Sequence, residues 1–185
     1  FFLEDATEVY NLLDRNLGVQ AYRGKRLPQQ VLPFDPNDGA AFWWSNGRNS
    51  LTRNTACENE EYGYRYDIQK SSTFNTELSI LMPDGSRKLT DVRTIPIFRF
   101  DDNEAHTEGL YGMVVAANGN NQPDDAIRDD RFLKTIRAID WTGPDIQHPH
   151  VIRNLKIWNA HYAFRPHSPS MLMENIRIHR VAYGI

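Results

Sequence analysis

Residues 49–66 carry the stretch that decides the fold, NSLTRNTACENEEYGYRY. It begins with two asparagines, Asn49 and Asn54, and ends in tyrosines that alternate with other residues. The segment NLLDRNLGV at 11–19 matches its first half, with asparagine, leucine, arginine and asparagine at the same offsets. A motif that returns with this spacing indicates a repeat architecture.

The C-terminal part of the chain contains a second repeat. LKIWNAHYAF at 155–164 aligns without gaps with IRIHRVAYGI at 176–185. Each copy alternates apolar and polar residues, which is the period of a strand with one buried face. IFRFDDNEAH at 97–106 offers the same asparagine-then-alanine corner at Asn103 and Ala105, and Asn159-Ala160 offers it again in looser register.

These repeats predict an all-β solenoid, a parallel β-helix in which each coil lays its strands against the next. Equivalent residues then stack at the inter-strand spacing of about 4.8 Å. Asparagine suits the corners because it tolerates left-handed backbone angles and its side chain can hydrogen-bond along a ladder. The alternative is that asparagine is simply a common turn residue.

Three segments interrupt the repeats and are expected to leave the stack as loops: 23–38, 69–94 and 118–150. The second should contain a hairpin around Pro83-Asp84-Gly85. The third has apolar residues near helical spacing over 124–139, which predicts a short helix. We expect one domain over 1–185, an excerpt of a longer chain, whose ends contact the remaining coils of that chain or neighbouring subunits.

The composition excludes several classes of protein. A content of 40% hydrophobic and 24% charged residues is that of a folded domain, not of a disordered chain. The net charge of −3, without a basic stripe, argues against a nucleic-acid partner. We also expect no transmembrane segment in this chain. The single cysteine, Cys57, is expected to be a small buried residue and does not settle the compartment.

Spaced motifs resemble those of a known family. FFLED-x-x-E-x-x-N at the start, FWW-x-N at 42–46, YGYRY at 62–66 and F-x-x-N-x-A-H at 100–106 occur in the same order in it. The chain resembles the right-handed parallel β-helix region of the cell-migration-inducing, cell-surface hyaluronidases and fibrocystin, with their bacterial relatives. One departure is Ala6, where relatives commonly have glycine, which puts the local turn in doubt.

The resemblance implies a right-handed β-helix and an extracellular, cell-surface or periplasmic location. Some relatives degrade hyaluronan and others look like receptors. The chain is therefore expected to be an extracellular module that binds a polysaccharide or other glycan, or depolymerises it as a hydrolase or lyase. The alternative is a non-catalytic structural or adhesive β-helix of a cell-surface or envelope assembly.

Catalysis would need carboxylates from adjacent coils, about 5 to 9 Å apart in a glycoside hydrolase. The candidates that lie in the family-like motifs are Glu4, Asp5, Asp101 and Glu104, with His106 nearby. The alternative is that these acids cap corners by accepting hydrogen bonds from backbone N–H groups. An enzyme should gather these side chains in one groove, whereas a structural module should use them in corner hydrogen bonds.

A divalent metal, calcium or zinc, has two candidate sites. In Asp145-x-x-His148-Pro-His150 the two histidines would point to one side of an extended chain, with Asp145 as a third ligand. FDPNDG at 34–39 is similar to a calcium loop but departs from the EF-hand pattern.

Aromatic residues could bind a sugar ring. On a strand, Trp43 would project opposite to Phe42 and Trp44, and an exposed tryptophan would be a natural platform. Tyr64 should share one face with Tyr62 and Tyr66. We therefore expect Trp43, Trp44 and Tyr64 as substrate-binding residues, with packing in the core as the alternative.

Overall fold

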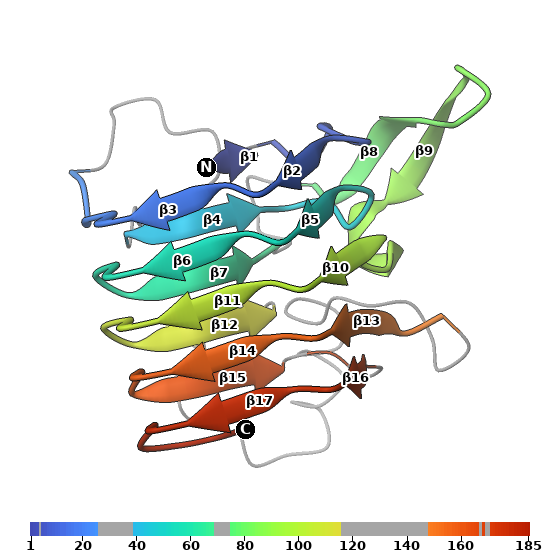
Figure 1. Cartoon of the computed structure of the whole chain (residues 1–185). Helices are drawn as coiled ribbons and strands as arrows, with labels where there is room; N and C mark the ends of the chain where they lie inside the picture. The colour runs from blue at the N-terminus through green and yellow to red at the C-terminus, as the bar shows by residue number, and fades with distance from the viewer. Residues whose placement is uncertain (4, 26–38, 69–74, 116–147, 167, 169–170) are drawn as a thin grey trace, which may run out of the picture.

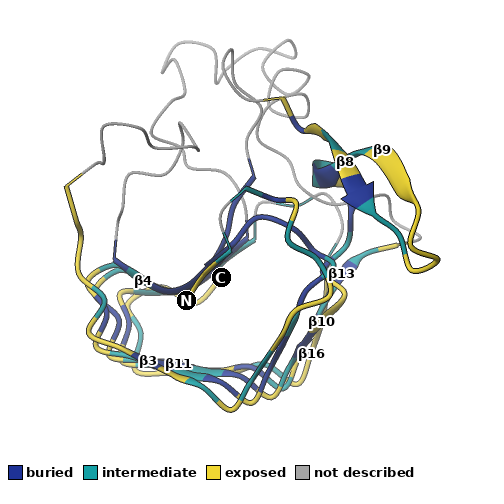
Figure 2. Cartoon of the chain, turned by 90° about the horizontal axis from the view of Figure 1, so that it is seen from above, coloured by how far each residue is buried: buried dark blue, intermediate teal, exposed yellow. Residues whose placement is uncertain are grey.

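The computed structural model of the chain describes residues 1–3, 5–25, 39–68, 75–115, 148–166, 168 and 171–185. Three parallel sheets of five strands each run along one axis, and the chain visits them in turn (Figure 1). Seen down that axis, successive coils superimpose on a common outline, along which buried residues recur (Figure 2). The fold is a parallel β-helix, as the sequence predicts.

Each sheet receives one strand from every coil. Sheet A contains β1 (Phe2–Leu3), β4 (Ala40–Trp44), β7 (Tyr62–Tyr66), β12 (Tyr111–Val115) and β15 (Tyr162–Pro166). Sheet B contains β2 (Leu12–Asp14), β5 (Ser50–Thr52), β10 (Arg99–Asp101), β13 (His150–Arg153) and β16 (Met171–Glu174). Sheet C contains β3 (Leu17–Val19), β6 (Thr55–Cys57), β11 (Glu104–His106), β14 (Lys156–Trp158) and β17 (Arg177–His179). We number the coils 1 to 5 from the N-terminus.

The register between coils is the one that the repeats predict. Leu13 pairs with Leu51 in sheet B, and Ile157 pairs with Ile178 in sheet C. A parallel bridge from Tyr162 to Tyr183 begins a further turn after coil 5. Because a slip of one residue would turn every buried side chain outward, this register is fixed by the alternation of apolar and polar residues.

Asparagine side chains join the first three coils at the corner between sheets B and C. Asn54 Oδ1 accepts from the backbone N and from Nδ2 of Asn16, both at 3.0 Å. Asn103 Oδ1 accepts the same pair of bonds from Asn54, at 2.9 and 3.0 Å. Asn54 and Asn103 are fully buried. The ladder satisfies backbone groups that the corner removes from the sheets.

The residue before each ladder position bends the chain. Arg15, Arg53 and Asp102 have φ of 56°, 55° and 59°, in the left-handed region. Asn154 and Asn175 hold the same conformation in coils 4 and 5, with φ of 53° and 54°. This repeated conformation turns the chain from sheet B into sheet C at every coil.

The expectation that Asn159-Ala160 repeats this corner is wrong. Lys156 pairs with Glu104, so the residue that follows Asn103 in the stack is Leu155. Asn159, with φ of 52°, lies at the next corner, after sheet C. Leu155 is fully buried, so coil 4 fills the corner with an apolar side chain where the earlier coils use an amide.

The interior is filled by stacked aromatic and aliphatic side chains. Phe42 stacks on Tyr64 with ring centroids 5.0 Å apart, and Phe100 meets Tyr64 edge-on at 5.1 Å. Trp44 lies parallel to Phe100 at 6.0 Å. The Phe42–Tyr64 stack joins two coils within sheet A, and the two contacts of Phe100 join sheets A and B across the core. Such ring pairs add to the burial of apolar area.

The predicted hairpin is confirmed. β8 (Glu77–Leu81) pairs antiparallel with β9 (Arg87–Asp91), and a short 3₁₀ helix, η1 (Val92–Thr94), follows (Figure 1). At its tip Gly85 has φ of 83° and donates its N–H to Met82 O at 3.0 Å. The helix expected at 124–139 lies outside the described residues. Among the residues that are described, no helix is long and apolar enough to span a bilayer.

Candidate functional site

The outer face of sheet C in coils 3 to 5 presents a regular grid of polar and aromatic side chains. Along β11, β14 and β17 the middle residues, Ala105, Ile157 and Ile178, pair with one another and pack in the core or against it. Alternation therefore turns the first and third residue of each strand outward. The result is two columns that cross the strands, bordered by the corner residues.

The first column carries charge. Glu104, Lys156 and Arg177 are register partners in successive coils. The Lys156 ammonium donates to Glu104 Oε1 at 2.5 Å. Among the described residues, the Arg177 side chain has no ion pair or hydrogen bond, and it is exposed. The column thus offers a neutralised lysine and a guanidinium that is open to a ligand.

The second column is aromatic. The Trp158 ring lies between the His106 ring, at 4.5 Å and 12°, and the His179 ring, at 5.9 Å and 5°. Because both faces of the indole are covered by imidazoles, the column presents ring edges to solvent. Ring edges can contact the C–H groups of a sugar, but a sugar cannot stack on either face of Trp158.

The corner column is a chain of hydrogen-bonded amides. Asn175 Nδ2 donates to Asn154 Oδ1 at 2.7 Å, and Asn154 Nδ2 donates to Asp102 Oδ1 at 2.8 Å. A second N–H on each amide and the remaining oxygen lone pairs are left for a ligand. The interactions between coils hold these side chains in one orientation, which reduces the entropy cost of binding.

A cavity of about 220 Å³ lies between the corner column and the charged column. Its lining consists of Asp102, Asn154, Lys156, Asn175 and Arg177. Every one of these residues carries a hydrogen-bonding or charged group. We refer to this cavity as the coil 3–5 cavity.

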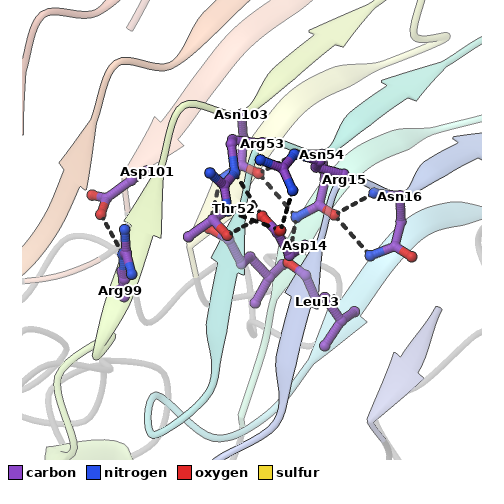
Figure 3. A network of polar contacts seen from close by, with 11 residues as sticks. Leu13, Asp14, Arg15, Asn16, Thr52, Arg53, Asn54, Arg99, Asp101 and Asn103 are labelled. Atoms are coloured by element: carbon purple, nitrogen blue, oxygen red, sulfur yellow. Dashed lines mark hydrogen bonds and ion pairs between the residues drawn. The ribbon is translucent and has the colours of Figure 1, made fainter.

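In sheet B, charged side chains form ion pairs with one another (Figure 3). Asp14 accepts from Arg53 Nε and Nη2 at 2.7 and 2.8 Å and from the Thr52 hydroxyl at 2.7 Å. The hydrogen bonds from Arg53 hold the pKa of the Asp14 carboxyl below its usual value. Arg99 Nε donates to Asp101 at 2.7 Å. The Asp14–Arg53 pair links coils 1 and 2, whereas the Arg99–Asp101 pair lies within β10 of coil 3.

The predicted catalytic residues are spread over the three sheets. Asp5 follows β1 of sheet A in coil 1, where its Oδ1 accepts from the Thr7 backbone N and hydroxyl. Asp101 ends β10 of sheet B in coil 3. Of the catalytic candidates that the structure describes, only Glu104 and His106 share one face, as the first and third residues of β11. Glu4 lies outside the described residues.

The two histidines of the predicted metal site lie in different environments. His150 is fully buried, and its Nδ1 accepts the Ile97 backbone N–H at 2.9 Å, whereas His148 is exposed. The expectation that both point to one side is wrong, because the strand begins only at His150. Asp145 and residues 34–38 of the calcium-like loop lie outside the described residues. Among the residues that are described, no three His, Cys, Asp or Glu side chains gather as metal ligands. Calcium or zinc binding stays a prediction.

The aromatic residues expected to be exposed are covered. Trp43 does project opposite to Phe42, but it stacks on Phe2 at 4.2 Å and is only 5% exposed. Trp44 and Tyr64 are buried in the core. The expected open platform is therefore wrong, since packing between coils encloses these rings.

The three tyrosines of β7 do not share a face either. The Tyr64 hydroxyl donates toward Asn54 O inside the coil, at 2.8 Å. Tyr62 stacks on Tyr111 and lies under the Arg65 guanidinium on the outer side of sheet A. The regular alternation breaks at Gly63, where a Cβ would lie 2.9 Å from Ala105 Cβ, in the interior.

Cys57 differs from the sequence expectation. Cys57 is not buried in the core but lies half-exposed on the outer face, as the register partner of His106. Burial raises the pKa of its thiol, which disfavours the nucleophilic thiolate.

Glu108 was not among the candidates, yet it is only 4% exposed and accepts from Asn59 N and Nδ2 at 3.2 and 3.1 Å. Burial raises its pKa to about 8. Its position in the stack below Asn59 was the available signal.

Comparison with known proteins agrees with this fold. Fibrocystin-L from Mus musculus and from Homo sapiens is each 29% identical over 119 residues, which is 62% of this chain. The match spans about 2% of the length of those relatives. No solved structure matches the chain. A family model described as the CEMIP β-helix matches residues 1–113, which hold coils 1 to 3 and most of β12. The chain belongs to the CEMIP β-helix family.

Proposed function

We propose that this β-helix module binds glycans at the coil 3–5 cavity, and that its ligand is an acidic polysaccharide of the hyaluronan type. The observation that carries the proposal is the lining of the cavity. Two ordered amides offer donors and acceptors for sugar hydroxyls, and Arg177 offers a guanidinium that no described residue neutralises. Arginine binds carboxylates through two parallel hydrogen bonds.

The family supports the same proposal. The motifs of the first three coils resemble those of cell-surface hyaluronidases, and membership of the CEMIP β-helix family gives that likeness weight. We accordingly place the module outside the cell, at the cell surface or in a periplasm. Partners there would be polysaccharides, together with further coils or subunits beside the stack.

Binding has more support in the geometry than depolymerisation. A hydrolase needs two carboxyl groups on either side of the scissile bond. Of the described catalytic candidates, only Glu104 and His106 share a face, and the Glu104 carboxylate is paired with Lys156. A second candidate, a structural or adhesive module without catalysis, is favoured by Asp5 and Asp101, which serve in a turn and in an ion pair.

The test is calorimetric titration of the 185-residue chain with hyaluronan oligosaccharides, with uncharged dextran oligosaccharides in parallel. We expect hyaluronan binding, weakened by roughly three- to tenfold in Asn175→Gly, which removes two hydrogen-bonding groups. Arg15→Gly is the matched control, because Arg15 holds the same left-handed corner in coil 1 and glycine strains neither site.

Two outcomes decide between the candidates. If the chain binds no polysaccharide, the structural module replaces the proposal. If it binds hyaluronan and also releases new reducing ends from it, the depolymerising reading is supported, and Glu104→Gln then identifies whether that carboxylate takes part.

A further inference from the structure

The β8–β9 hairpin has an open edge along β9, the strand that lies farther from the stack (Figure 1). The other strand faces the body of the protein, where Leu81 O accepts from the Tyr10 hydroxyl at 3.2 Å and from Arg48 Nη1 at 3.3 Å. Among the described residues, none outside the hairpin bonds to the backbone of Arg87 or Leu89. An edge of this kind is a template for another strand.

The hydrogen bonds at the two ends of the hairpin show which backbone groups point to this edge. Near the tip, Met82 N donates to Ser86 O at 2.8 Å. At the base, Val92 N donates to Thr76 O at 2.9 Å. Bonded and non-bonded pairs alternate between these two positions in an antiparallel pair. Every second residue of β9, beginning with Arg87, therefore directs its N–H and C=O away from β8.

The three residues that face the edge in this way are Arg87, Leu89 and Asp91. Their side chains also share one face of the hairpin, since side chains alternate along a strand. Leu89 is 67% exposed, Arg87 is exposed, and the Asp91 carboxylate is half-buried and accepts from Arg93 Nη2 at 2.6 Å. The edge thus presents a positive, an apolar and a negative residue at equal steps. Such an order is complementary to itself when it is reversed.

We propose that β9 pairs antiparallel with β9 of a second copy of this chain, about a two-fold axis at Leu89. Leu89 then exchanges both backbone hydrogen bonds with its own counterpart, and Arg87 and Asp91 exchange theirs with each other. Opposite charges lie directly across from one another at both ends, which stabilises a cross-strand pair. The interface is isologous, as in most homodimers. It is separate from the coil 3–5 cavity and does not depend on glycan binding.

The charge order fixes the register of this pairing. Sliding the copies by two residues would place Leu89 opposite a charged residue, and a parallel alignment would place like charges together. Charges on an edge strand usually block association, but here they oppose every arrangement except one. The contact involves a single strand from each copy, less than a standard interface buries, so the dimer should be weak and reversible.

The first arm of the test is sedimentation velocity of the 185-residue chain at roughly 10 to 500 µM, the range in which a weak dimer forms. We expect the dimer fraction to rise over this range. Leu89→Lys places like charges opposite each other at the axis and should lower the association constant by roughly tenfold or more. Ser79→Lys is the matched control, because Ser79 is exposed and is the register partner of Leu89 on β8, away from the open edge.

The second arm follows backbone amide hydrogen exchange of the wild-type chain at the two ends of this concentration range. Exchange of the Leu89 amide should slow as the dimer forms, because that amide becomes bonded to the second copy. The Lys88 amide is the internal control, since alternation assigns its bond to β8 and its exchange should not depend on concentration. Circular dichroism checks that both lysine variants are folded.

A chain that stays monomeric over the whole range overturns the proposal. A dimer that both lysine variants weaken equally depends on net charge, and a dimer that Leu89→Lys leaves intact uses another surface. A dimer in which the Leu89 amide exchanges at the same rate as in the monomer is not joined by backbone pairing of β9. Each of these results overturns the proposal and leaves the proposed glycan-binding function standing.

Discussion

Asn103 Oδ1 accepts two hydrogen bonds from one residue of the preceding coil, Asn54, through its backbone N at 2.9 Å and its Nδ2 at 3.0 Å. Asn103 Nδ2 in turn donates to Leu51 O at 2.8 Å. One buried amide thus closes three bonds between coils 2 and 3. A corner without it would leave polar groups of both coils buried and unpaired.

The variant Asn103→Ala should therefore be strongly destabilising. It leaves two donors of Asn54 and the Leu51 carbonyl without their partner, at a cost of about 1 to 3 kcal/mol for each group that water cannot reach. We expect the free energy of unfolding, measured by urea denaturation, to fall by roughly 3 kcal/mol or more. Lys88→Ala, on the exposed hairpin, should leave it within about 0.5 kcal/mol. An equal, small effect of both variants would contradict the ladder's role.

Gly47 lies in close contact with the backbone at Ile95 and Pro96, just after the second insertion. A Cβ at this position would lie 2.3 Å from Pro96 O and 2.8 Å from Ile95 O, and both contacts are backbone atoms. Gly47→Ala should consequently shift the chain segment at Pro96 and lower the free energy of unfolding by about 1 to 3 kcal/mol. Gly184→Ala is the matched control, since a Cβ there meets no atom within 4 Å. Thermal unfolding of both variants measures the difference.

Repetition is what made the fold predictable from sequence. Leu13 pairs with Leu51 and Ile157 with Ile178 as the alignments require, because stacked coils place equivalent residues side by side. The corner at Asn159 was misplaced for a physical reason. At the corner position that Asn103 fills with a hydrogen-bonded amide, coil 4 has Leu155, which fills it by apolar packing. The position is kept while the residue type changes.

The candidate site was less predictable. Glu104 and His106 were two of the five catalytic candidates and do share a face, because alternation along a strand is visible in sequence. Lys156, Arg177 and Trp158 were not, although they line up with that pair across coils. The expected exposure also failed at Trp43, which points outward as predicted but is covered by Phe2 from another coil. Contacts between coils decide exposure, and alternation alone does not contain them.

The buried carboxyl of Glu108 makes stability depend on pH. Burial raises its pKa from 4.5 to about 8, so the folded chain binds the proton more tightly than the unfolded chain. The stability is fully present below pH 4.5 and is lost progressively as pH rises toward about 8, where the folded group also ionises. The size of the loss is on the order of a few kcal/mol.

Glu108→Gln tests this dependence, because the amide carries no charge, although its single oxygen can accept only one of the two hydrogen bonds that Asn59 donates. Urea denaturation of both proteins between pH 5 and pH 9 should show a decline in the wild-type chain that is smaller in the variant. Parallel profiles would mean that Glu108 ionises at an ordinary pH in the fold and that other groups cause the decline.

The ion pair between Glu104 and Lys156 should limit the affinity of the coil 3–5 cavity for acidic glycans. Lys156 donates to Glu104 Oε1 at 2.5 Å, so a carboxylate ligand must compete with a carboxylate already in place. Glu104→Gln removes the competing charge and should strengthen binding of hyaluronan oligosaccharides by roughly three- to tenfold, an effect that added salt screens. Stability should change by less than about 1 kcal/mol, as is typical of an exposed pair.

The double variant Glu104→Gln with Lys156→Gln isolates the cause. If the gain comes from releasing the Lys156 ammonium, it disappears when the lysine is also replaced, and calorimetric titration of the four proteins gives a coupling between the two positions. A gain that persists without Lys156 would assign it to the loss of negative charge alone. A loss of affinity in Glu104→Gln would instead mean that the Glu104 carboxylate contacts the glycan directly, which is the arrangement a catalytic acid or base requires.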